Sequence, residues 1–316
     1  MLRSFEISAP GKIILHGEHS VVYNKPAIAG PIGLRTYFNF QETSNDFITF
    51  SYERLQLTTK LSIKNANLLL TELDCHEAIP PIDFLQKFRS STEFILNFIE
   101  VDNQRKLNDK EQMAVGATLY IFNRVLRNEK IQNIKTSFDI KIDSDMSIGA
   151  GVGSSASYGV CLAATFFAFS KLIHGEFSRD FLFTDDDLAK ISQWAFDSEV
   201  IMHEKPSGID NTICTYGQLI KFSRGQTPEP IKTNATIDIL LVDTGVSRST
   251  SQVVRKVVEF RDKHLKLLDA IFDAMGYLVD DVVTVLEGSS DKYQELAPLV
   301  SVNNNLLRSL NVSHPQ

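Results

Sequence analysis

A glycine-rich segment, GAGVGSSAS at residues 149–157, has the composition of an anion-binding loop. Its three glycines would let backbone N–H groups approach phosphate oxygens, and a helix that begins at Ser154 or Ser155 would add the positive end of its dipole. One serine hydroxyl could cap that helix, and the other could ligate a metal ion carried by the phosphates. The segment lacks the Gly-Lys-Ser/Thr ending of a P-loop and the Gly-x-Gly-x-x-Gly spacing of a dinucleotide fold, so a simple tight turn stays open as the alternative.

Two carboxylates bracket a turn in the second cluster, SEVIMHEKPSGIDN at residues 198–211. A helix that carries Glu199 should end before Pro206, and a Ser-Gly turn leads to Asp210. The two carboxylates could act as a magnesium ligand and a general base, which are the roles that phosphoryl transfer to a hydroxyl needs. The alternative is a surface helix end followed by an Asx-type turn.

The third cluster, PGKIILHGEHSVVY at residues 10–23, offers one cation and two imidazoles. Lys12 follows a Pro-Gly turn, where a fixed positive charge could stabilise transferring phosphates. His16 and His19 do not predict a metal site, because side chains three residues apart on an extended segment point to opposite faces and no Glu-x-x-His helix is present. A hydrogen-bonded structural role is the simpler interpretation for each histidine.

The elements around the glycine loop follow the order strand, loop, buried helix. TSFDIKIDSDM at residues 136–146 alternates like a half-buried strand, and the charge-free run from Ala156 to Ser170 predicts a core helix that is shorter than the roughly 20 residues of a membrane span. Thr184 with Asp187 predicts a capping box at the start of the helix of the second cluster. The acidic run at 185–187 is therefore interpreted as a helix start and not as a metal site.

Other segments predict further strands and helices. In residues 5–30, short apolar runs are interrupted at Pro10-Gly11 and at residues 24–26, which indicates strands joined by turns. Ser90 with Glu93 has the signature of another capping box and predicts a second helix start.

A second domain is expected after the polar, turn-rich residues 221–236, because the composition changes there. We divide the chain into residues 1–228 and 229–316. IDILLVDTG at 237–245 predicts a strand, and an amphipathic helix should follow at 249–275. The apolar positions of that helix are Val254, Val258, Leu265, Leu268, Phe272 and Met275.

Composition describes an ordinary globular chain of 316 residues, 43% hydrophobic and 22% charged, which is long enough for two domains. A net charge of -7 argues against nucleic-acid binding and favours a small-molecule partner. Cys75, Cys161 and Cys214 are too widely separated to predict a disulfide framework or a zinc site. The N-terminus has no apolar signal region, so we expect a cytoplasmic protein without a membrane partner.

The three clusters together resemble the GHMP small-molecule kinases. APGKIILHGEHSVVY, SIGAGVGSSASYGVCLAA and HEKPSGIDNTICTYG stand in the order and approximate spacing of that family, and the resemblance extends over roughly residues 4–315. It is greatest to the members that phosphorylate mevalonate in isoprenoid and sterol biosynthesis; galactokinases share the glycine-serine loop but differ in the first motif. The resemblance implies an α/β fold of two domains, with a phosphate loop in the N-terminal domain and a ferredoxin-like α+β C-terminal domain.

The resemblance also implies roles for individual residues. Asp210 would take the proton from the mevalonate hydroxyl or orient that hydroxyl, and Lys12 would modulate the pKa of Asp210. Ser155 and Glu199 would hold Mg²⁺. The ATP phosphates would lie against Gly149, Ala150, Gly151, Val152, Gly153, Ser154 and Ser155. The substrate would contact Lys12, Glu18, His19, Asp210 and Thr244.

One feature of the family is missing from the sequence. Its members have a further glycine-rich loop in the C-terminal domain, whereas the only glycines after residue 250 here are Gly276 and Gly288. We therefore expect an incomplete C-terminal domain, weak ATP binding and little or no turnover. A noncatalytic nucleotide- or protein-binding module, and a kinase of the family for another small alcohol, are the alternatives. The family also suggests a homodimer.

Overall fold

The chain forms two compact units. A computed structural model describes residues 3–72, 81, 83, 98–102, 105–178, 180–203, 206–233, 237–242, 250–288 and 292–312. The first unit comprises residues 1–11 and 32–217, and the second comprises residues 12–31 and 218–316. Strands β1 (Ser4–His16) and β2 (Ala27–Thr43) contribute residues to both units.

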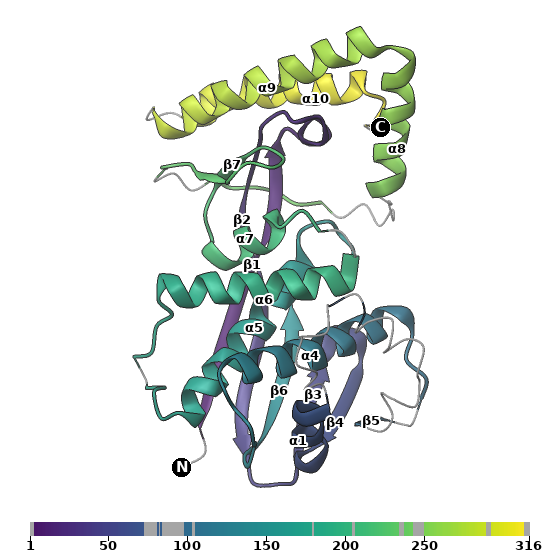
Figure 1. The fold of residues 1–316 in the computed structure, drawn as a ribbon. Coiled ribbons are helices and arrows are strands. Elements are labelled where there is room, and N and C mark those ends of the chain that lie inside the picture. The colour runs from purple at the N-terminus through teal and green to yellow at the C-terminus, as the bar shows by residue number, and fades with distance from the viewer. Residues whose placement is uncertain are drawn as a thin grey trace. The chain divides into compact units, whose positions relative to one another are not determined.

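The first unit contains a mixed sheet with the strand order β5-β4-β3-β6-β2 (Figure 1). Its further strands are β3 (Phe47–Tyr52), β4 (Leu57–Ser62), β5 (Ile99–Val101) and β6 (Ser137–Ser144). Strand β6 is antiparallel to β2 and parallel to β3. Along β6, Phe138, Ile140 and Ile142 are buried, whereas Lys141 and Asp143 between and after them are exposed. This alternation confirms the half-buried strand predicted before the glycine loop.

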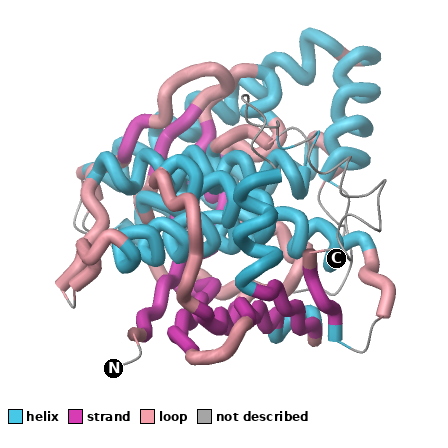
Figure 2. The backbone as a smooth tube through the Cα atoms, turned by 60° about the horizontal axis from the view of Figure 1, so that its bottom comes forward, coloured by secondary structure: helices cyan, strands magenta, loops and turns pink. Residues whose placement is uncertain are grey.

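Helices of the first unit lie on one face of this sheet (Figures 1 and 2). They are α1 (Ile63–Glu72), α4 (Asp109–Asn128), α5 (Ser154–Ile173), α6 (Asp185–His203) and α7 (Ile209–Tyr216). Aromatic side chains fill the space between the two layers; the rings of Phe138 on β6 and Phe169 on α5 have centroids 4.6 Å apart. The core of this unit therefore lies between the sheet and the helices that carry the predicted site residues.

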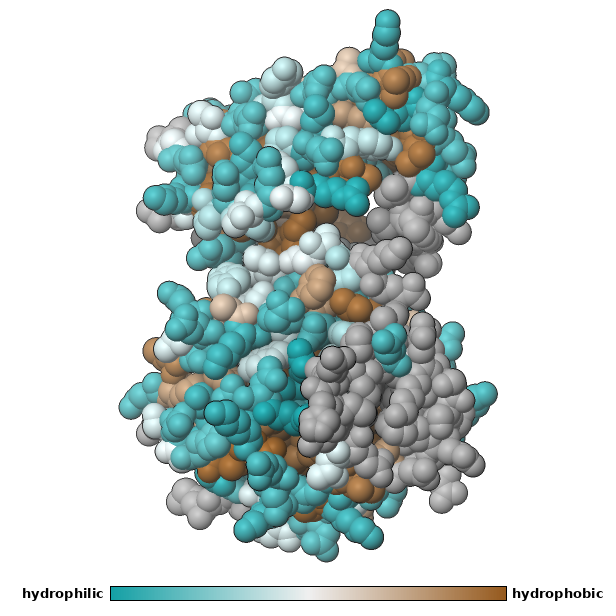
Figure 3. Space-filling model, viewed as in Figure 1, coloured by the Kyte–Doolittle hydropathy of each residue, from teal (hydrophilic) through white to brown (hydrophobic). Residues whose placement is uncertain are grey.

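Helix α5 is the buried core helix that its charge-free sequence predicts. It is long and apolar enough to cross a membrane, but 89% of its most apolar stretch is buried inside the protein, as expected for a core helix. The Ser157 hydroxyl donates a hydrogen bond to the Ala9 carbonyl oxygen (2.7 Å) and so fixes the helix to β1. Hydrophilic side chains dominate the described part of the face drawn in Figure 3, which agrees with an apolar interior.

The capping box at the start of α6 is confirmed. The Thr184 backbone N–H donates to the Asp187 carboxylate (3.0 Å), and the Asp187 N–H donates to the Thr184 hydroxyl (3.2 Å). The acidic run at 185–187 forms the first turn of the helix, where its negative charge interacts favourably with the positive end of the helix dipole. The other predicted capping box, Ser90 with Glu93, lies outside the described residues.

The second unit combines short strands with long helices. Residues 27–29 of β2 pair with β7 (Ile220–Phe222), which pairs with β8 (Glu229–Pro230). The 3-10 helix η1 (Ser20–Tyr23) and the helices α8 (Thr250–Lys263), α9 (Leu265–Glu287) and α10 (Lys292–Ser309) complete its described elements. Tyr23 stacks on Phe272 of α9 with ring centroids 4.3 Å apart, which holds η1 against the helices.

The strand predicted at 237–245 is not found. Its described part, residues 237–242, lies in neither a helix nor a strand, and the side chains of Leu240 and Val242 are 89% and 73% exposed. A strand needs a neighbour that pairs with its backbone groups, and among the described residues no strand pairs with this segment. Its apolar sequence alone was therefore a poor guide to its structure.

The single helix predicted at 249–275 is two helices that meet at His264. Leu268, Phe272 and Met275 are buried as predicted, but Val258 and Leu265 are exposed, and Val257 is buried instead. In α8 the buried face therefore includes Val257 and not the predicted Val258, whereas the predicted buried positions of α9 other than Leu265 are confirmed. The side chain of Val254 lies outside the described part of the chain.

The predicted turn at Pro10-Gly11 is also wrong, because β1 runs through it without interruption. Among the strands that the structure describes, β1 pairs only with β2, and a strand with one paired edge tolerates the missing N–H of a proline. The turn at residues 24–26 is confirmed: Asn24 has a left-handed backbone (φ 61°) and β2 begins just after it.

Candidate functional site

Three glycines shape the loop between β6 and α5. Gly149, Gly151 and Gly153 have φ values of 86°, 77° and 76°, a conformation that residues with a Cβ atom rarely adopt. Gly153 is the N-cap of α5, and no side chain caps the helix. The predicted serine cap is therefore wrong, because both serines lie inside the first turn. The N–H groups of a first turn have no intrahelical partner, so they are suited to an anion.

The backbone of β1 lies directly against this loop at Gly11. A Cβ atom on Gly11 would lie 2.3 Å from the Met146 sulfur and 2.6 Å from the Val152 carbonyl oxygen, so only glycine fits. Lys12 is the next residue along the chain. It belongs to the continuous strand β1 and does not follow a turn, as the sequence had suggested.

The loop serine and the buried carboxylate of α6 meet at one imidazole. The Ser155 Oγ lies 2.9 Å from Nε2 of His203, and the same nitrogen lies 4.0 Å from Oε1 of Glu199. Glu199 is only 3% exposed, so its carboxylate does not lie on the surface, although α6 ends at the exposed His203. The structure thus brings together Ser155 and Glu199, the two residues predicted to share a metal ion.

His203 is the residue that sequence reasoning missed. It lies four residues after Glu199, so both side chains share one face of α6, and that spacing could have identified it. The pairing with Ser155 depends on how α5 and α6 pack, which the sequence does not state.

Asp210 occupies the first turn of α7, directly after the turn at Gly208. Gly208 has a φ of 82°, and the Asn211 side-chain amide donates to the backbone oxygen and the hydroxyl of Ser192 on α6 (both 3.0 Å). These bonds fix the start of α7 against α6. Asp210 therefore lies on a helix whose first turn is fixed against α6.

The remaining predicted residues lie in the second unit, where burial changes their acidity. Glu18 accepts a hydrogen bond from the Asn303 amide (3.5 Å), and burial raises the pKa of its carboxyl group. Burial lowers the pKa of the His19 imidazole, and it lowers the pKa of His16 to about 4. Thr244 lies outside the described residues.

His16 differs from the expected hydrogen-bonded structural histidine. Its side chain is buried, and neither ring nitrogen has a hydrogen-bond partner within the part of the chain that the structure describes. The neutral ring is therefore strongly favoured in the folded protein.

The oxygen atoms near His203 suit a hard cation that also binds phosphate. Within the described ranges, no group of three His, Cys, Asp or Glu side chains is arranged to hold a metal ion by itself. Mg²⁺ in nucleotide sites needs only one or two protein oxygens, since phosphates and water supply the others. The Ser155 hydroxyl and the Glu199 carboxylate match that requirement.

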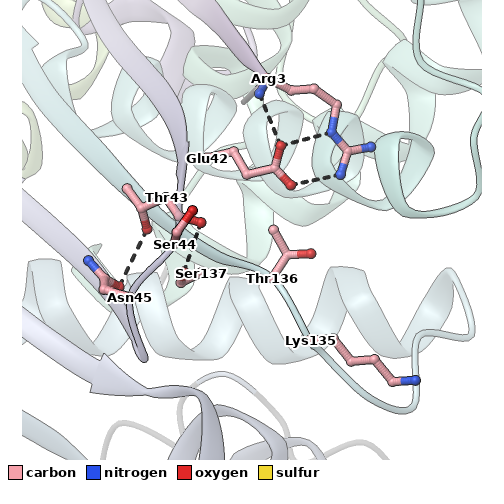
Figure 4. A pocket seen from close by; sticks show the side chains of 8 residues that line it. All are labelled: Arg3, Glu42, Thr43, Ser44, Asn45, Lys135, Thr136 and Ser137. Carbon is pink, nitrogen blue, oxygen red and sulfur yellow. Dashed lines mark hydrogen bonds and ion pairs between the residues drawn. The ribbon is translucent and has the colours of Figure 1, made fainter. Parts of the chain in front are cut away.

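A separate hollow of about 720 Å³ in the first unit contains none of the predicted residues (Figure 4). Arg3 donates to both carboxylate oxygens of Glu42 (2.8 and 3.0 Å) and to the Leu172 carbonyl oxygen (3.2 Å). Its charge is thus already neutralised, which makes this hollow a poor anion site. The lining residues are Arg3, Glu42, Thr43, Ser44, Asn45, Lys135, Thr136 and Ser137.

Comparison with known proteins gives a consistent family. Residues 114–218 match the GHMP kinases N terminal domain. The mevalonate kinase of Bos taurus is 31% identical over 98% of this chain and 77% of its own length, and that of Homo sapiens is 30% identical over the same shares.

Solved structures show the same fold. The mevalonate kinase of Methanococcus jannaschii superposes with a TM-score of 0.65 at 21% identity, over 99% of this chain and 81% of that one. The L. major mevalonate kinase in complex with R-mevalonate also has a TM-score of 0.65 at 21% identity, over 99% and 78%. These likenesses establish the GHMP kinase fold, a mixed α/β architecture with a mixed sheet. By its identity to curated relatives over nearly its whole length, the chain belongs to the mevalonate kinases of the GHMP kinase family.

Proposed function

We propose that this protein transfers the γ-phosphoryl group of ATP to the 5-hydroxyl of (R)-mevalonate. The family supports the reaction class, and one observation in the structure carries the assignment: Ser155, beside the glycine loop, and Glu199 meet at His203 (2.9 and 4.0 Å from its Nε2). This places a hydroxyl and a carboxylate at the start of α5, where an ATP phosphate would bind.

The glycine loop and the first turn of α5 would bind the phosphates through backbone N–H groups. Ser155 and Glu199 would hold Mg²⁺, which neutralises charge on the phosphate oxygens when it is bound. Lys12 follows Gly11, whose backbone touches the loop, so its ammonium group is a suitable source of positive charge for the transferring phosphoryl group.

Asp210 would act on the acceptor. Its carboxylate accepts the proton of the mevalonate 5-hydroxyl, or orients that hydroxyl, while the hydroxyl oxygen forms a bond to the γ-phosphorus. The bond between this phosphorus and the bridging oxygen breaks, and ADP leaves. The fixed start of α7 keeps the carboxylate in one position.

Glu18, His19 and Thr244 would complete the acceptor site together with Lys12 and Asp210. Because burial lowers the pKa of His19, its neutral imidazole would form a hydrogen bond with the mevalonate carboxylate. Glu18, with its raised pKa, would bind a substrate hydroxyl.

At the level of the whole chain, we propose an N-terminal domain of residues 1–228 and a ferredoxin-like C-terminal domain of residues 229–316. We also propose a homodimer in the cytoplasm. Membership of the family supports these assignments.

The site of phosphorylation tests the proposal. Mevalonate has a primary 5-hydroxyl and a tertiary 3-hydroxyl, so the two products differ in their proton-coupled ³¹P NMR spectra. We expect a new phosphomonoester signal split into a triplet by the two protons on C5, and none in a reaction without ATP. A signal without this splitting, or no phosphomonoester, would contradict the proposal.

A further inference from the structure

The contact between Ser155 and His203 connects the phosphate loop to the end of α6. Its length, 2.9 Å from Oγ to Nε2, is that of a well-formed hydrogen bond. The imidazole lies at the last residue of α6 and its side chain is 55% exposed, so the bond is not part of the buried core.

Close packing of two helices sets this contact. A Cβ atom on Gly159 of α5 would lie 3.0 Å from the Ser198 Cβ atom and 3.2 Å from the Ala195 carbonyl oxygen of α6. The helix axes therefore approach closely one turn beyond Ser155. This fixed spacing brings the side chain of His203 within reach of the serine hydroxyl.

We propose that His203 is a positioning residue that holds the Ser155 hydroxyl, beside Glu199, in the arrangement that receives Mg²⁺. The inference rests on the proposed function and adds to it a residue with no assigned role. A serine hydroxyl has three staggered rotamers, and one fixed hydrogen-bond partner selects a single one.

The bond also leaves the serine able to bind a cation. A hydroxyl has one donor and two acceptor lone pairs, so donation of its hydrogen to Nε2 keeps both lone pairs for the ion. Residues behind a metal ligand commonly orient it in this way. The same Nε2 atom lies 4.0 Å from Oε1 of Glu199, so both proposed oxygen ligands are near one nitrogen.

Binding of a fluorescent ATP analogue, measured with and without Mg²⁺, tests the role without using turnover. We expect His203→Phe to weaken binding in the presence of Mg²⁺ by about tenfold, the usual scale for loss of a residue behind a metal ligand. Binding without Mg²⁺ should change by less than about twofold. His203→Gln, which keeps a hydrogen-bonding group, should recover part of the loss.

His174→Phe is the matched control. His174 follows the other end of α5 and also makes one hydrogen-bonding contact, to the Glu129 carbonyl oxygen (3.0 Å). If His203 only stabilised its helix, His203→Phe and His174→Phe should have similar effects on binding of the analogue. We expect the control variant to bind the analogue like the wild type at every Mg²⁺ concentration.

A double-mutant cycle decides whether His203 acts through Ser155. In a Ser155→Ala background, His203→Phe should cause no further loss of Mg²⁺-dependent binding. The inference would be overturned if the losses of affinity from the two substitutions multiplied in the double variant, or if His203→Phe alone bound the analogue like the wild type. Either result leaves the proposed function intact as long as the wild type phosphorylates mevalonate. A wild type without mevalonate-dependent ADP release would instead refute the proposed function. If His203→Phe does not fold by circular dichroism, His203→Ala replaces it in the cycle.

Discussion

At the scale of single residues, Asp210 carries the sharpest expectation. Asn is nearly the same size but cannot accept the proton, so Asp210→Asn should lower kcat by at least about a hundredfold. The fold and the affinity for ATP should remain, because the Asn211 side chain, which the substitution leaves in place, fixes the start of α7 against α6. Steady-state kinetics and nucleotide titration measure both quantities. A decrease of less than about tenfold in a folded variant would remove Asp210 from the role of base.

Substitutions of Ser155 and Glu199 should change the Mg²⁺ requirement of the protein in the same way. Ser155→Ala removes an oxygen and Glu199→Gln removes a charge from a site that suits a hard cation, so both variants should need more Mg²⁺ for half-maximal activity. Activity measured across a Mg²⁺ series at saturating ATP gives the comparison. Wild-type Mg²⁺ dependence in both variants would show that these side chains only support the helices.

His16 links the fold to pH. Burial lowers the pKa of its imidazole from 6.5 to about 4. Between these values the unfolded chain binds a proton that the folded protein does not, so the free energy of unfolding falls as the pH is lowered through this window.

The corresponding variant is His16→Gln, which removes the titrating group. We expect the wild type to lose more stability between pH 7 and pH 5 than this variant, as measured by urea unfolding at the two pH values. The exposed His174 provides the control. His174→Gln should lose as much free energy of unfolding between pH 7 and pH 5 as the wild type does. The account would be contradicted if wild type and His16→Gln lost the same free energy of unfolding between pH 7 and pH 5.

At the scale of elements, β1 and the glycine loop depend on Gly11. A methyl group there would meet the Val152 backbone oxygen at 2.6 Å, so Gly11→Ala must displace the loop. We expect a loss of about 1–3 kcal/mol in the free energy of unfolding, together with weaker nucleotide binding.

Gly33, in β2 of the same unit, is a suitable comparison because an added Cβ atom would have nothing within 4 Å. Gly33→Ala should change stability by no more than about 0.5 kcal/mol. Denaturant unfolding of the two alanine variants separates steric displacement of the loop from a general effect of glycine replacement. Equal losses would contradict the role of Gly11.

Local pattern predicted those elements whose structure depends on nearby residues. The alternation in β6, the apolar run of α5 and the Thr184–Asp187 capping box each lie within one element, and all three were confirmed. Contacts between elements were not predictable. His203 reaches Ser155 only because α5 and α6 pack closely, and residues 237–242 remain outside any strand because no described strand pairs with them.

At the scale of the whole molecule, the residues proposed to bind the ATP phosphates and Mg²⁺ lie in the first unit. The loop, Glu199, His203 and Asp210 all lie within residues 114–218, the segment that matches the GHMP kinase N-terminal domain. Lys12, Glu18 and His19 belong to the second unit. The residues named in the proposed function are therefore divided between the two units.

The most direct test of the central claim is acceptor-dependent ADP release, followed by a coupled assay at one enzyme concentration with mevalonate, galactose or homoserine. The comparison measures selectivity, so it remains informative when turnover is slow. We predict ADP formation above the acceptor-free background with mevalonate and no increase with galactose or homoserine. A preference for either of the other alcohols, or ADP release that no acceptor stimulates, would contradict the assignment of this chain as a kinase that acts on mevalonate.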